Sequence, residues 1–322
     1  MDAMEELRHR MEKARETSQS RHGKKITFFL PGIFTLNGVT GKYPAVSITG
    51  NRCDLCCEHC KGTLLHSMIH TETPEQLVNR CISQWERGAF GLLISGGCDR
   101  MGRLPWETFL PAIEEIKRKT DLFISVHSGI VDALTARRLK DAGVDQALID
   151  VIGDDETYQA IYHVDFGISK IINSLEHLQD AGIPVIPHVV CGLYYGRIRG
   201  EKKAVNIISR FDVEQVVIVS LMNLPGPKGT RFELPTAEEI ADVIVETRER
   251  IPHAEISLGC ARQRGNTRIE TMAIEAGVNR MAIPSDEAIA LAEKSGLEIR
   301  YQSTCCSVPT DQSGKSWAPT EN

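Results

Sequence analysis

The chain has 322 residues, of which 42% are hydrophobic and 25% are charged, the ordinary balance of a globular domain. Its formal net charge of −6 provides no basic field for nucleic acid, and no apolar run approaches the length of a membrane span. The length allows one large α/β domain with small appendages.

The N-terminal residues and the cysteine content indicate the cellular compartment in which the protein works. Residues 1–21 are charged and polar, without the apolar core of a signal peptide, and they predict an amphipathic or frayed helix. The chain contains 10 cysteines. Without a leader, this number favours metal or redox use in a reducing cytoplasm over disulfides. We therefore expect a cytoplasmic protein.

A cysteine cluster follows the first predicted strand. Residues 45–49 are apolar and β-branched, and a glycine ends the run. The segment Cys-Asp-Leu-Cys-Cys-Glu-His-Cys comes next, in which Cys53, Cys57 and Cys60 have the spacing C-x3-C-x2-C. Three thiolates on one loop can hold three irons of a 4Fe–4S cluster and leave the fourth iron with an open position.

Two other interpretations of this loop are open. A zinc site could use all four thiols, including Cys56, because C-x2-C pairs ligate zinc. However, structural zinc sites take their pairs from two separated knuckles, and four cysteines within eight residues close awkwardly into a tetrahedron. Free cysteines also pack as small hydrophobic residues and can cluster by chance. The preceding strand and the spacing favour the iron–sulfur interpretation, with Cys56 as a neighbour that is not a ligand.

The following sequence alternates apolar strands with amphipathic helices, which predicts βα units and a parallel sheet. The expected strands are 45–49, 91–95, 122–127, 146–151, 185–191, 216–221, 255–259 and 280–283. The expected helices are 74–87, 106–119, 132–142, 168–181, 202–210, 237–250, 267–276 and 286–295. This pattern predicts an α/β fold, a (β/α)8 barrel of the TIM type, whose ligand chemistry sits on the loops after the strands.

We expect three parts in the chain. Residues 1–41 form an N-terminal helical extension, residues 42–296 form the barrel, and residues 297–322 form a tail that carries Cys305 and Cys306. The composition turns polar after Val308, so we expect the end of the tail to be disordered.

Polar residues and glycines gather at the predicted strand ends. The second strand ends at Gly96-Gly97, which either approaches a ligand through its backbone or forms a plain glycine turn. The third strand ends at His127 and the fourth at Asp150, and either side chain can line a site or make an ordinary hydrogen bond inside the barrel. Gly192, after the fifth strand, allows close approach of the backbone to a ligand.

The remaining cysteines predict a second iron–sulfur cluster. Cys260 lies just beyond a strand end, and Cys305 and Cys306 form an adjacent pair in a tail that would fold over the mouth of the barrel. These three are the preferred ligands, with Cys98 or Cys191 as a possible fourth. Alternatively, single cysteines at such positions only line a pocket.

The chain resembles the radical S-adenosylmethionine (radical SAM) superfamily, of which the C-x3-C-x2-C spacing is the signature, and within it the branch that is like biotin synthase. More closely, it resembles a subunit of the two-component radical SAM lipoyl synthase of archaea and bacteria, from about residue 42 to residue 306. The motifs that carry this resemblance are Ser47–Cys53, His59-Cys60, Ser95–Cys98, Pro187-His188, Gly192–Gly196, Gly200-Glu201, Gly259–Arg262 and Cys305-Cys306.

The resemblance implies cofactors and their contacts. Cys53, Cys57 and Cys60 would hold a 4Fe–4S cluster that binds SAM and cleaves it to a 5′-deoxyadenosyl radical. His59 would lie against the adenine, and the backbone of Gly96 and Gly97 would contact the methionine amine. The residues expected to complete the SAM site are His127, Asp150, which could hold a ribose hydroxyl or an ammonium group, and Gly192.

The resemblance also implies a reaction, the insertion of sulfur into an octanoyl chain on a protein lysine. The auxiliary cluster would supply the sulfur. The expected partners are an octanoylated lipoyl carrier protein or peptide, a related radical SAM subunit, and an electron donor of the ferredoxin or flavodoxin type. Arg262 would orient the cluster or an amide of the substrate, or form a structural salt bridge.

Two alternatives to this function stay open. One is another enzyme of the same branch that acts on a small molecule: a mutase, a methylase or a cofactor maturase. The other is an iron–sulfur scaffold or electron carrier without catalysis, which would need neither a barrel nor glycine-rich strand ends. No residue is assigned a catalytic role, and the sequence does not tell which carbon receives sulfur.

Overall fold

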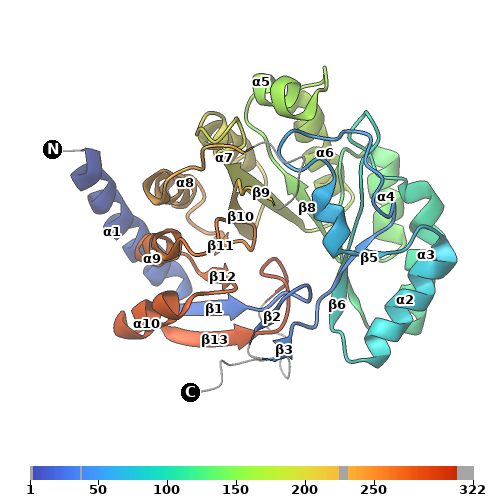
Figure 1. Cartoon of the computed structure of the whole chain (residues 1–322), viewed down its shortest axis with the longest axis horizontal. Coiled ribbons are helices and arrows are strands. Elements are labelled where there is room, and N and C mark those ends of the chain that lie inside the picture. The colour runs from blue at the N-terminus through green and yellow to red at the C-terminus, as the bar shows by residue number, and fades with distance from the viewer. Residues whose placement is uncertain (1–2, 37, 225–230, 310–322) are drawn as a thin grey trace.

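The computed structural model describes residues 3–36, 38–224 and 231–309. The described chain forms one eleven-stranded sheet in the order β13-β1-β12-β11-β10-β9-β8-β7-β6-β4-β5, in which neighbouring strands are parallel. Figure 1 shows this sheet curled into a partial barrel that stays open between its two edges. A short hairpin, β2 (Thr35–Leu36) with β3 (Val39–Thr40), lies beside the opening.

The eight expected strands are present and pair in consecutive order. They are β4 (Ala45–Ser47), β6 (Gly91–Ser95), β7 (Phe123–His127), β8 (Gln146–Asp150), β9 (Val185–Cys191), β10 (Gln215–Ser220), β11 (Glu255–Leu258) and β12 (Arg280–Ala282). The expected α/β barrel fold is confirmed, but as a partial barrel: the set of eight strands does not close into a full ring. Among the described strands, β12 pairs with β1 instead of β4, because β1 (Lys25–Phe29) is a β-branched and aromatic run that occupies this edge.

Besides the hairpin strands β2 and β3, three strands of the main sheet were therefore missed. Besides β1, from the segment expected as an N-terminal extension, they are β13 (Glu298–Gln302), from the expected tail, and β5 (Ile69–His70), a two-residue strand on the edge of β4. β13 pairs with β1 in parallel. The N-terminal and C-terminal segments thus meet in the same sheet.

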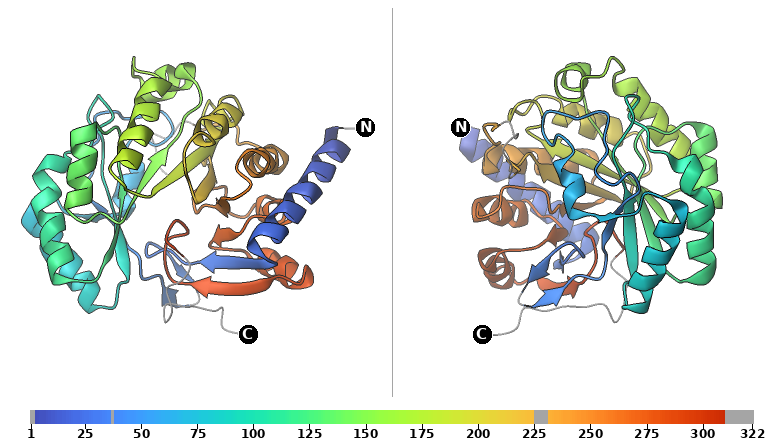
Figure 2. Two further views of the ribbon diagram at one scale, coloured as in Figure 1. Left: turned by 180° about the vertical axis from the view of Figure 1, so that it is seen from behind. Right: turned by 45° about the vertical axis from the view of Figure 1, so that its right-hand side comes forward.

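Helices cover the outside of the sheet, as Figure 2 shows from two further sides. The expected helices are α2 (Pro74–Glu86), α3 (Trp106–Lys119), α4 (Ala133–Asp141), α6 (Ile168–Asp180), α7 (Glu201–Ile208), α8 (Ala237–Arg250), α9 (Thr267–Glu275) and α10 (Asp286–Lys294). Side chains start several of them: Thr236 and Glu239 form a reciprocal capping box at α8, and Ser285 caps α10. The N-terminal helix α1 (Ala3–His22) packs on α8 and α9 and buries Leu7 and Met11.

Side chains that face the inside of the sheet form three layers, as alternation along parallel strands requires. Buried polar side chains form a floor: Gln146, Gln215 and Arg280 begin their strands, Ser125 pairs in register with Gln146, and Ser257 pairs with Arg280. An apolar middle layer follows: Phe29, Leu148, Ile186, Val217, Val219 and Ala282. Polar side chains toward the strand ends form an upper layer: Ser95, His127, Asp150 and His188.

The C-terminal tail lies at the floor and not, as expected, over the mouth of the barrel. Gln215 Nε2 donates to the Cys306 carbonyl at 2.8 Å, Arg280 Nε donates to the same carbonyl at 2.9 Å, and Gln146 Nε2 donates to the Ser307 carbonyl at 3.2 Å. Buried polar groups require partners, and the tail backbone supplies them to the three floor side chains. The expected disordered end, from residue 310 on, lies outside the described residues.

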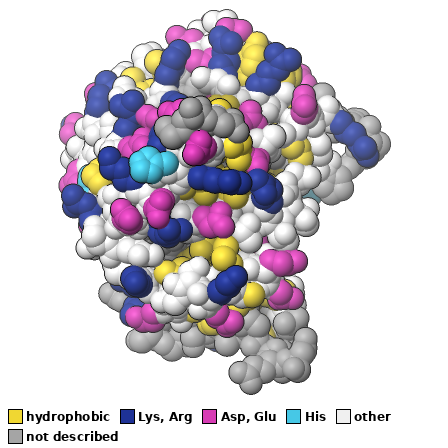
Figure 3. Space-filling model, turned by 90° about the vertical axis from the view of Figure 1, so that its left-hand side faces the viewer, with side chains coloured by type: hydrophobic (Ala, Val, Ile, Leu, Met, Phe, Trp, Pro, Cys, Tyr) yellow, Lys and Arg dark blue, Asp and Glu magenta, His cyan; other side chains and the backbone are white. Residues whose placement is uncertain are grey.

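The surface gives few functional indications by itself. No helix in the described ranges is long and apolar enough to cross a membrane. On the face at the left of Figure 1, acidic and basic side chains lie interspersed, as Figure 3 shows. This face therefore offers no large region of one charge to a partner.

Candidate active site

The cysteine loop follows β4 and folds back on itself. The Ser47 hydroxyl donates to the Gly50 carbonyl at 2.6 Å, and the backbone N–H of Lys61 donates to the Cys57 carbonyl at 2.8 Å. These turns direct three thiols, those of Cys53, Cys57 and Cys60, into one cavity of about 260 Å³. We call it the cysteine cavity.

Cys56 lies apart from the other three thiols. It is exposed, its backbone has a φ of 46°, and it does not line the cysteine cavity. This placement agrees with the expectation that Cys56 is not a ligand, which stays a prediction. No group of three His, Cys, Asp or Glu side chains within the described part of the chain is close enough to hold a single metal ion.

The thiols of the loop interact electrostatically. A hydrogen bond from Cys57 lowers the pKa of Cys60, helped by His59, whereas the same bond and burial raise the pKa of Cys57. Cys53 and Cys98 lie close enough to affect the Cys57 thiol as well. The thiolate is the form that binds metal, so one thiol of the group is already biased toward the ligand form.

Gly97 fits the end of β6 against the cysteine loop. A Cβ atom at this position would lie 2.5 Å from the Cys53 Cβ and 2.0 Å from the Arg52 carbonyl oxygen. Neither Gly96 nor Gly97 has a positive φ, so a glycine turn does not explain the pair. The Gly97 N–H donates to Thr49 Oγ1 at 2.7 Å. The absence of a side chain at Gly97 therefore lets the cysteine loop approach β6. The three thiols of the loop and this close backbone fit a cluster held by thiolates.

The upper layer supplies polar groups to the same cavity. Ser95 Oγ and His127 Nδ1 are 3.1 Å apart, and burial first and His188 second lower the pKa of His127 to about 4. The Asp150 side chain lines the cavity, and burial between the cavity walls raises its pKa. Burial acts most strongly on the pKa of His59 and lowers it, but the hydrogen bond with Cys60 and the charges of Cys60 and Asp150 together raise it. At neutral pH, His127 is therefore an uncharged donor or acceptor.

One expected cofactor contact is not brought to the cavity. Gly192 has a φ of 77° and donates its N–H to Glu201 Oε1 at 2.7 Å. A Cβ there would lie 2.7 Å from the Pro235 ring, and Gly192 does not line the cysteine cavity. The expected site residues that do line it are Cys53, Cys57, His59, Cys60, Gly96, Gly97, Cys98, His127 and Asp150.

An aromatic wall of the cavity was missed by sequence reasoning. After α5 (Asp155–Thr157), residues Tyr158–Tyr162 form a π-helix, and both tyrosines and Phe166 line the cavity. The ring centroids of His59 and Tyr162 are 5.6 Å apart, those of Tyr158 and Tyr162 5.4 Å, and those of Tyr158 and Phe166 5.8 Å. Aromatic residues four apart along the chain were the available signal.

The second group of cysteines also converges. Cys260, Cys305 and Cys306 pack together beside the apolar middle layer. A hydrogen bond from Cys306 lowers the pKa of Cys305 to about 6, and the Ser307 hydroxyl donates to the Cys305 sulfur at 3.3 Å. The structure thus joins two tail cysteines with one that follows β11.

The two further ligands considered for this group lie elsewhere. Cys98 lines the cysteine cavity. Cys191 is fully buried in the hydrophobic core between the sheet and the helices that cover it. Its side chain points outward because His188 and Val190 take the inward positions on β9. Neither is brought to Cys260, Cys305 and Cys306.

The contacts of Arg262 with the protein are structural. It is fully buried, its Nη2 atom is 2.7 Å from Glu270 Oε1, and its Nη1 atom donates to the Gly259 carbonyl at 2.6 Å. A further hydrogen bond of 2.8 Å joins it to the Ile283 carbonyl. The structural salt bridge, one of the two expectations for this residue, is what the geometry supports.

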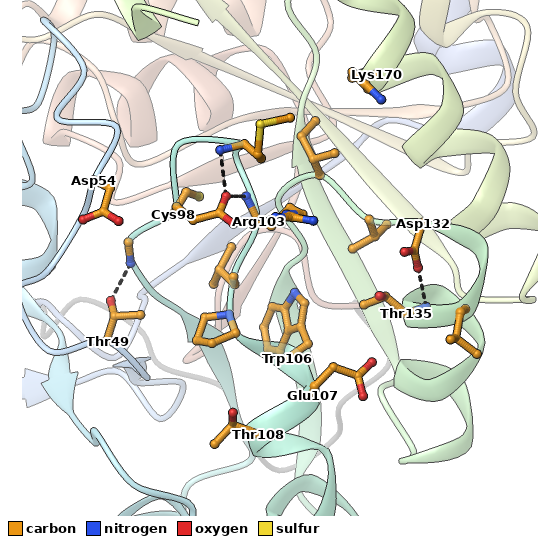
Figure 4. A pocket seen from close by; sticks show the side chains of 18 of the residues that line it. Thr49, Asp54, Cys98, Arg103, Trp106, Glu107, Thr108, Asp132, Thr135 and Lys170 are labelled. Carbon is orange, nitrogen blue, oxygen red and sulfur yellow. Dashed lines mark hydrogen bonds and ion pairs between the residues drawn. The ribbon is translucent and has the colours of Figure 1, made fainter. Parts of the chain in front are cut away.

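An outer groove of about 780 Å³ opens next to the cysteine cavity. Figure 4 shows it between Thr49 and Cys98 on one side and the starts of α3 and α4, with Lys170 of α6, on the other. The groove and the cavity share Gly97, Cys98, Leu104, Ile130 and Phe166. The cysteine cavity, although smaller, holds the metal-binding chemistry.

Comparisons with known proteins agree with this geometry. A biotin synthase from Citrifermentans bemidjiense is 25% identical over 247 residues, which cover 72% of this chain and 73% of that protein. One from Pelobacter propionicus is 22% identical over 246 residues, which cover 73% of each. These are distant relatives.

Solved structures share the fold. Methylornithine synthase (PylB) matches with a TM-score of 0.59 and 16% identity, over 93% of this chain and 90% of that one. The FeFe-hydrogenase maturase HydG from Carboxydothermus hydrogenoformans matches with a TM-score of 0.66 and 16% identity, over 94% and 74%. The Radical SAM superfamily model matches residues 47–209, just over half of the chain. This chain therefore belongs to the radical SAM superfamily and is a radical SAM enzyme related to biotin synthase.

Proposed function

We propose that this enzyme inserts sulfur into an octanoyl chain carried on a protein lysine, as a contribution to lipoyl cofactor synthesis together with a related radical SAM subunit. The proposal includes an electron donor of the ferredoxin or flavodoxin type and an octanoylated carrier protein or peptide as substrate. The related subunit follows from the resemblance of the cysteine loop, the glycine pair and the tail cysteines to a two-component synthase.

Cys53, Cys57 and Cys60 would hold the 4Fe–4S cluster that binds SAM. When bound, these cofactors supply the means to remove hydrogen atoms from unactivated carbon, such as that of an acyl chain. The protein contributes the close approach at Gly97, the biased thiol at Cys60, and a cavity wall of aromatic side chains. These features position the cofactors and exclude water from them.

Cys260, Cys305 and Cys306 would hold the auxiliary cluster, the proposed source of sulfur. Their convergence supports this assignment, since the tail brings two thiols across the sheet to the one after β11. The tail is also firmly anchored, because floor side chains bond its carbonyls at Cys306 and Ser307. With Cys98 and Cys191 placed elsewhere, a fourth ligand would come from another group.

The observation that carries the proposal is the apolar layer that adjoins both cysteine groups. The cysteine cavity lies at the strand ends, whereas the carbonyls of Cys306 and Ser307 lie at the strand starts. Leu148 lines the cysteine cavity, and it packs with Ile186, Val217 and Cys306 in the apolar middle layer. A linear acyl arm would suit a lumen lined by such apolar side chains, because its length would let the carrier protein stay outside.

Another enzyme of the branch, acting on a small molecule, is the alternative. The likeness of the fold to methylornithine synthase and HydG over more than 90% of this chain favours it. A small polar substrate would use the upper layer, where Ser95, His127 and Asp150 offer hydrogen bonds. This alternative function would give no role to the buried cysteines of the tail.

The test is a reaction of the reduced holoenzyme with SAM and an octanoyl-lysyl peptide, with and without the related subunit. Mass spectrometry of the peptide should show a product that carries sulfur. The matched control is the Cys305→Ala/Cys306→Ala double variant, which should still cleave SAM but yield no thiolated peptide. SAM cleavage by the unaltered protein without thiolated peptide in either arm would favour the alternative.

A further inference from the structure

His188 presents a hydrogen-bond acceptor to the inside of the barrel. It lies on the same face of β9 as Ile186, which belongs to the apolar middle layer. Its Nδ1 atom is 3.0 Å from the Ile186 carbonyl oxygen. A carbonyl oxygen only accepts, so Nδ1 carries the proton of the neutral ring and Nε2 carries none. This Nε2 atom has no hydrogen-bond partner among the described residues.

The surroundings of His188 keep this acceptor available to a ligand. Burial lowers the pKa of His188 to about 4, so the ring is neutral at pH 7. The side chain is nevertheless partly exposed. Because it points to the inside of the sheet, the exposed part of the ring faces the lumen. A molecule in the lumen can therefore donate a hydrogen bond to Nε2.

His127 supplies the complementary donor. It lines the cysteine cavity, and its Nδ1 atom is the one partner, at 3.1 Å, of the buried Ser95 hydroxyl in the described chain. A buried hydroxyl requires an acceptor, so the Ser95 proton points to Nδ1 and the neutral His127 ring carries its own proton at Nε2. The ring centroids of His127 and His188 are 6.1 Å apart, and the rings are nearly perpendicular, at 86°. The two rings thus offer one donor and one acceptor to the same part of the lumen.

A secondary amide matches this pair of rings. Its oxygen accepts one hydrogen bond and its N–H donates one, whereas a thioester or an ester has no N–H to offer to His188. The apolar middle layer adjoins the pair, since Leu148 is in register with His127 and Ile186 lies two residues from His188. An apolar chain attached to the amide would therefore meet apolar side chains.

We propose that His127 and His188 hold the amide that joins the octanoyl chain to its lysine. His127 Nε2–H donates to the amide oxygen, and His188 Nε2 accepts from the amide N–H. The pair selects an acyl chain carried on an amine over one carried on a thiol or a hydroxyl group. This inference rests on the proposed function and deepens it by naming the linkage that the enzyme recognises.

The test compares two peptides that differ in one group. One carries octanoyl-lysine, and the other carries the octanoyl ester of the lysine analogue whose side chain ends in a hydroxyl group, so that an oxygen replaces the amide N–H. Their dissociation constants are measured with the anaerobically reconstituted holoenzyme and S-adenosylhomocysteine in place of SAM, so that no turnover occurs. The unaltered holoenzyme should bind the amide about 3- to 10-fold more tightly than the ester, the range for one hydrogen bond.

The variants separate the two rings. His188→Phe should lose the preference for the amide, because it removes the acceptor of the N–H. His188→Gln keeps an acceptor oxygen and should retain part of the preference. His127→Phe should weaken both peptides by a similar factor, because both contain the carbonyl. The control is His70→Phe, which removes a comparable bond, of 3.1 Å to the Leu65 carbonyl, in a separate groove beside α2, and it should keep the preference.

The outcomes distinguish this inference from the proposed function. An unchanged amide preference in His188→Phe would overturn the inference, and thiolation of the octanoyl-lysyl peptide would then stand without it. An equal loss of preference in His70→Phe would also overturn it. So would a weaker affinity for S-adenosylhomocysteine as the only effect of His188→Phe, since the ring would then serve the cofactor. Failure of both peptides to bind the unaltered holoenzyme would overturn the inference together with the proposed function.

Discussion

At the scale of single residues, close approach of backbones decides where the chemistry can sit. Gly97 brings β6 into contact with Cys53, and the Thr49 hydroxyl secures the Gly97 N–H. The cysteine spacing and the glycine pair could be predicted from sequence, because both are local patterns. The absence of Gly192 from the cavity could not, because its position depends on the contact with Glu201. Tyr158 was missed because the aromatic spacing of this segment does not by itself reveal the π-helical turn that brings the ring to the cavity.

Replacement of Gly97 by alanine should disturb the cysteine loop. The new Cβ would meet backbone and Cβ atoms at 2.0–2.5 Å, which cannot move as a flexible side-chain end can. We expect markedly lower iron content after anaerobic reconstitution, measured per folded chain. Gly96→Ala is the control, because its closest contacts are side-chain atoms of Thr49 and Ile48 at 3.1–3.3 Å. Equal iron content in the two variants would show that Gly97 does not position the loop.

The buried histidine of the upper layer predicts a dependence of stability on pH. His127 has its pKa lowered from 6.5 to about 4, so the unfolded chain binds a proton first as the pH falls. Its contribution to stability is therefore present above pH 6.5 and is lost progressively down to about pH 4. In the cluster-free protein, His127→Gln should reduce this loss by at most about 3 kcal/mol.

Urea unfolding at several pH values between 4 and 7 measures that contribution. The exposed His253 serves as the control, and His253→Gln should follow the curve of the unaltered protein. Asp150 and His188 act on the titration of His127 and are unchanged in both variants. Parallel curves for His127→Gln and the unaltered protein would contradict the buried, uncharged state of His127.

At the scale of elements, the sequence predicted the strands that have apolar runs, but it did not predict the strands at the edges of the sheet. Each of the eight expected strands exists, because apolar β-branched runs bury on both faces of a parallel sheet. β1 pairs with the free edge of β12, and β13 pairs with β1 in turn. These pairings depend on the arrangement of the whole sheet and not on a local sequence pattern. The tail lies at the floor for a similar reason, since Gln146, Gln215 and Arg280 require acceptors there.

Arg280 should hold the tail in place. It is 3% exposed, and it donates to the carbonyls of Cys306 and Val308 while it pairs with Glu255. Arg280→Met should cost about 2–4 kcal/mol of stability, because buried acceptors lose their donor. Hydrogen exchange at residues 303–308 should increase. Arg300→Met, which removes an exposed pair with Glu298 on β13, should change both by little, and an equal effect of the two would contradict the anchoring role.

At the scale of the whole molecule, the partial barrel separates two groups of thiols along one lumen. The cysteine cavity lies at the strand ends, the Cys306 backbone bonds to the floor, and an apolar layer adjoins both through Leu148 and Cys306. The outer groove adjoins the first site and gives it a route to solvent. The likeness to biotin synthase and the shared fold place the chemistry in the radical SAM class. The substrate depends on what the second group of thiols holds.

Iron counting by Mössbauer spectroscopy on the anaerobically purified holoenzyme tests this account most directly. The unaltered protein is compared with the Cys305→Ala/Cys306→Ala double variant, at equal folded concentration. Two clusters in one lumen predict that the double variant loses about four irons per chain and keeps the about four at Cys53, Cys57 and Cys60. An unchanged iron count in the double variant would contradict a second cluster and, with it, the proposed source of sulfur.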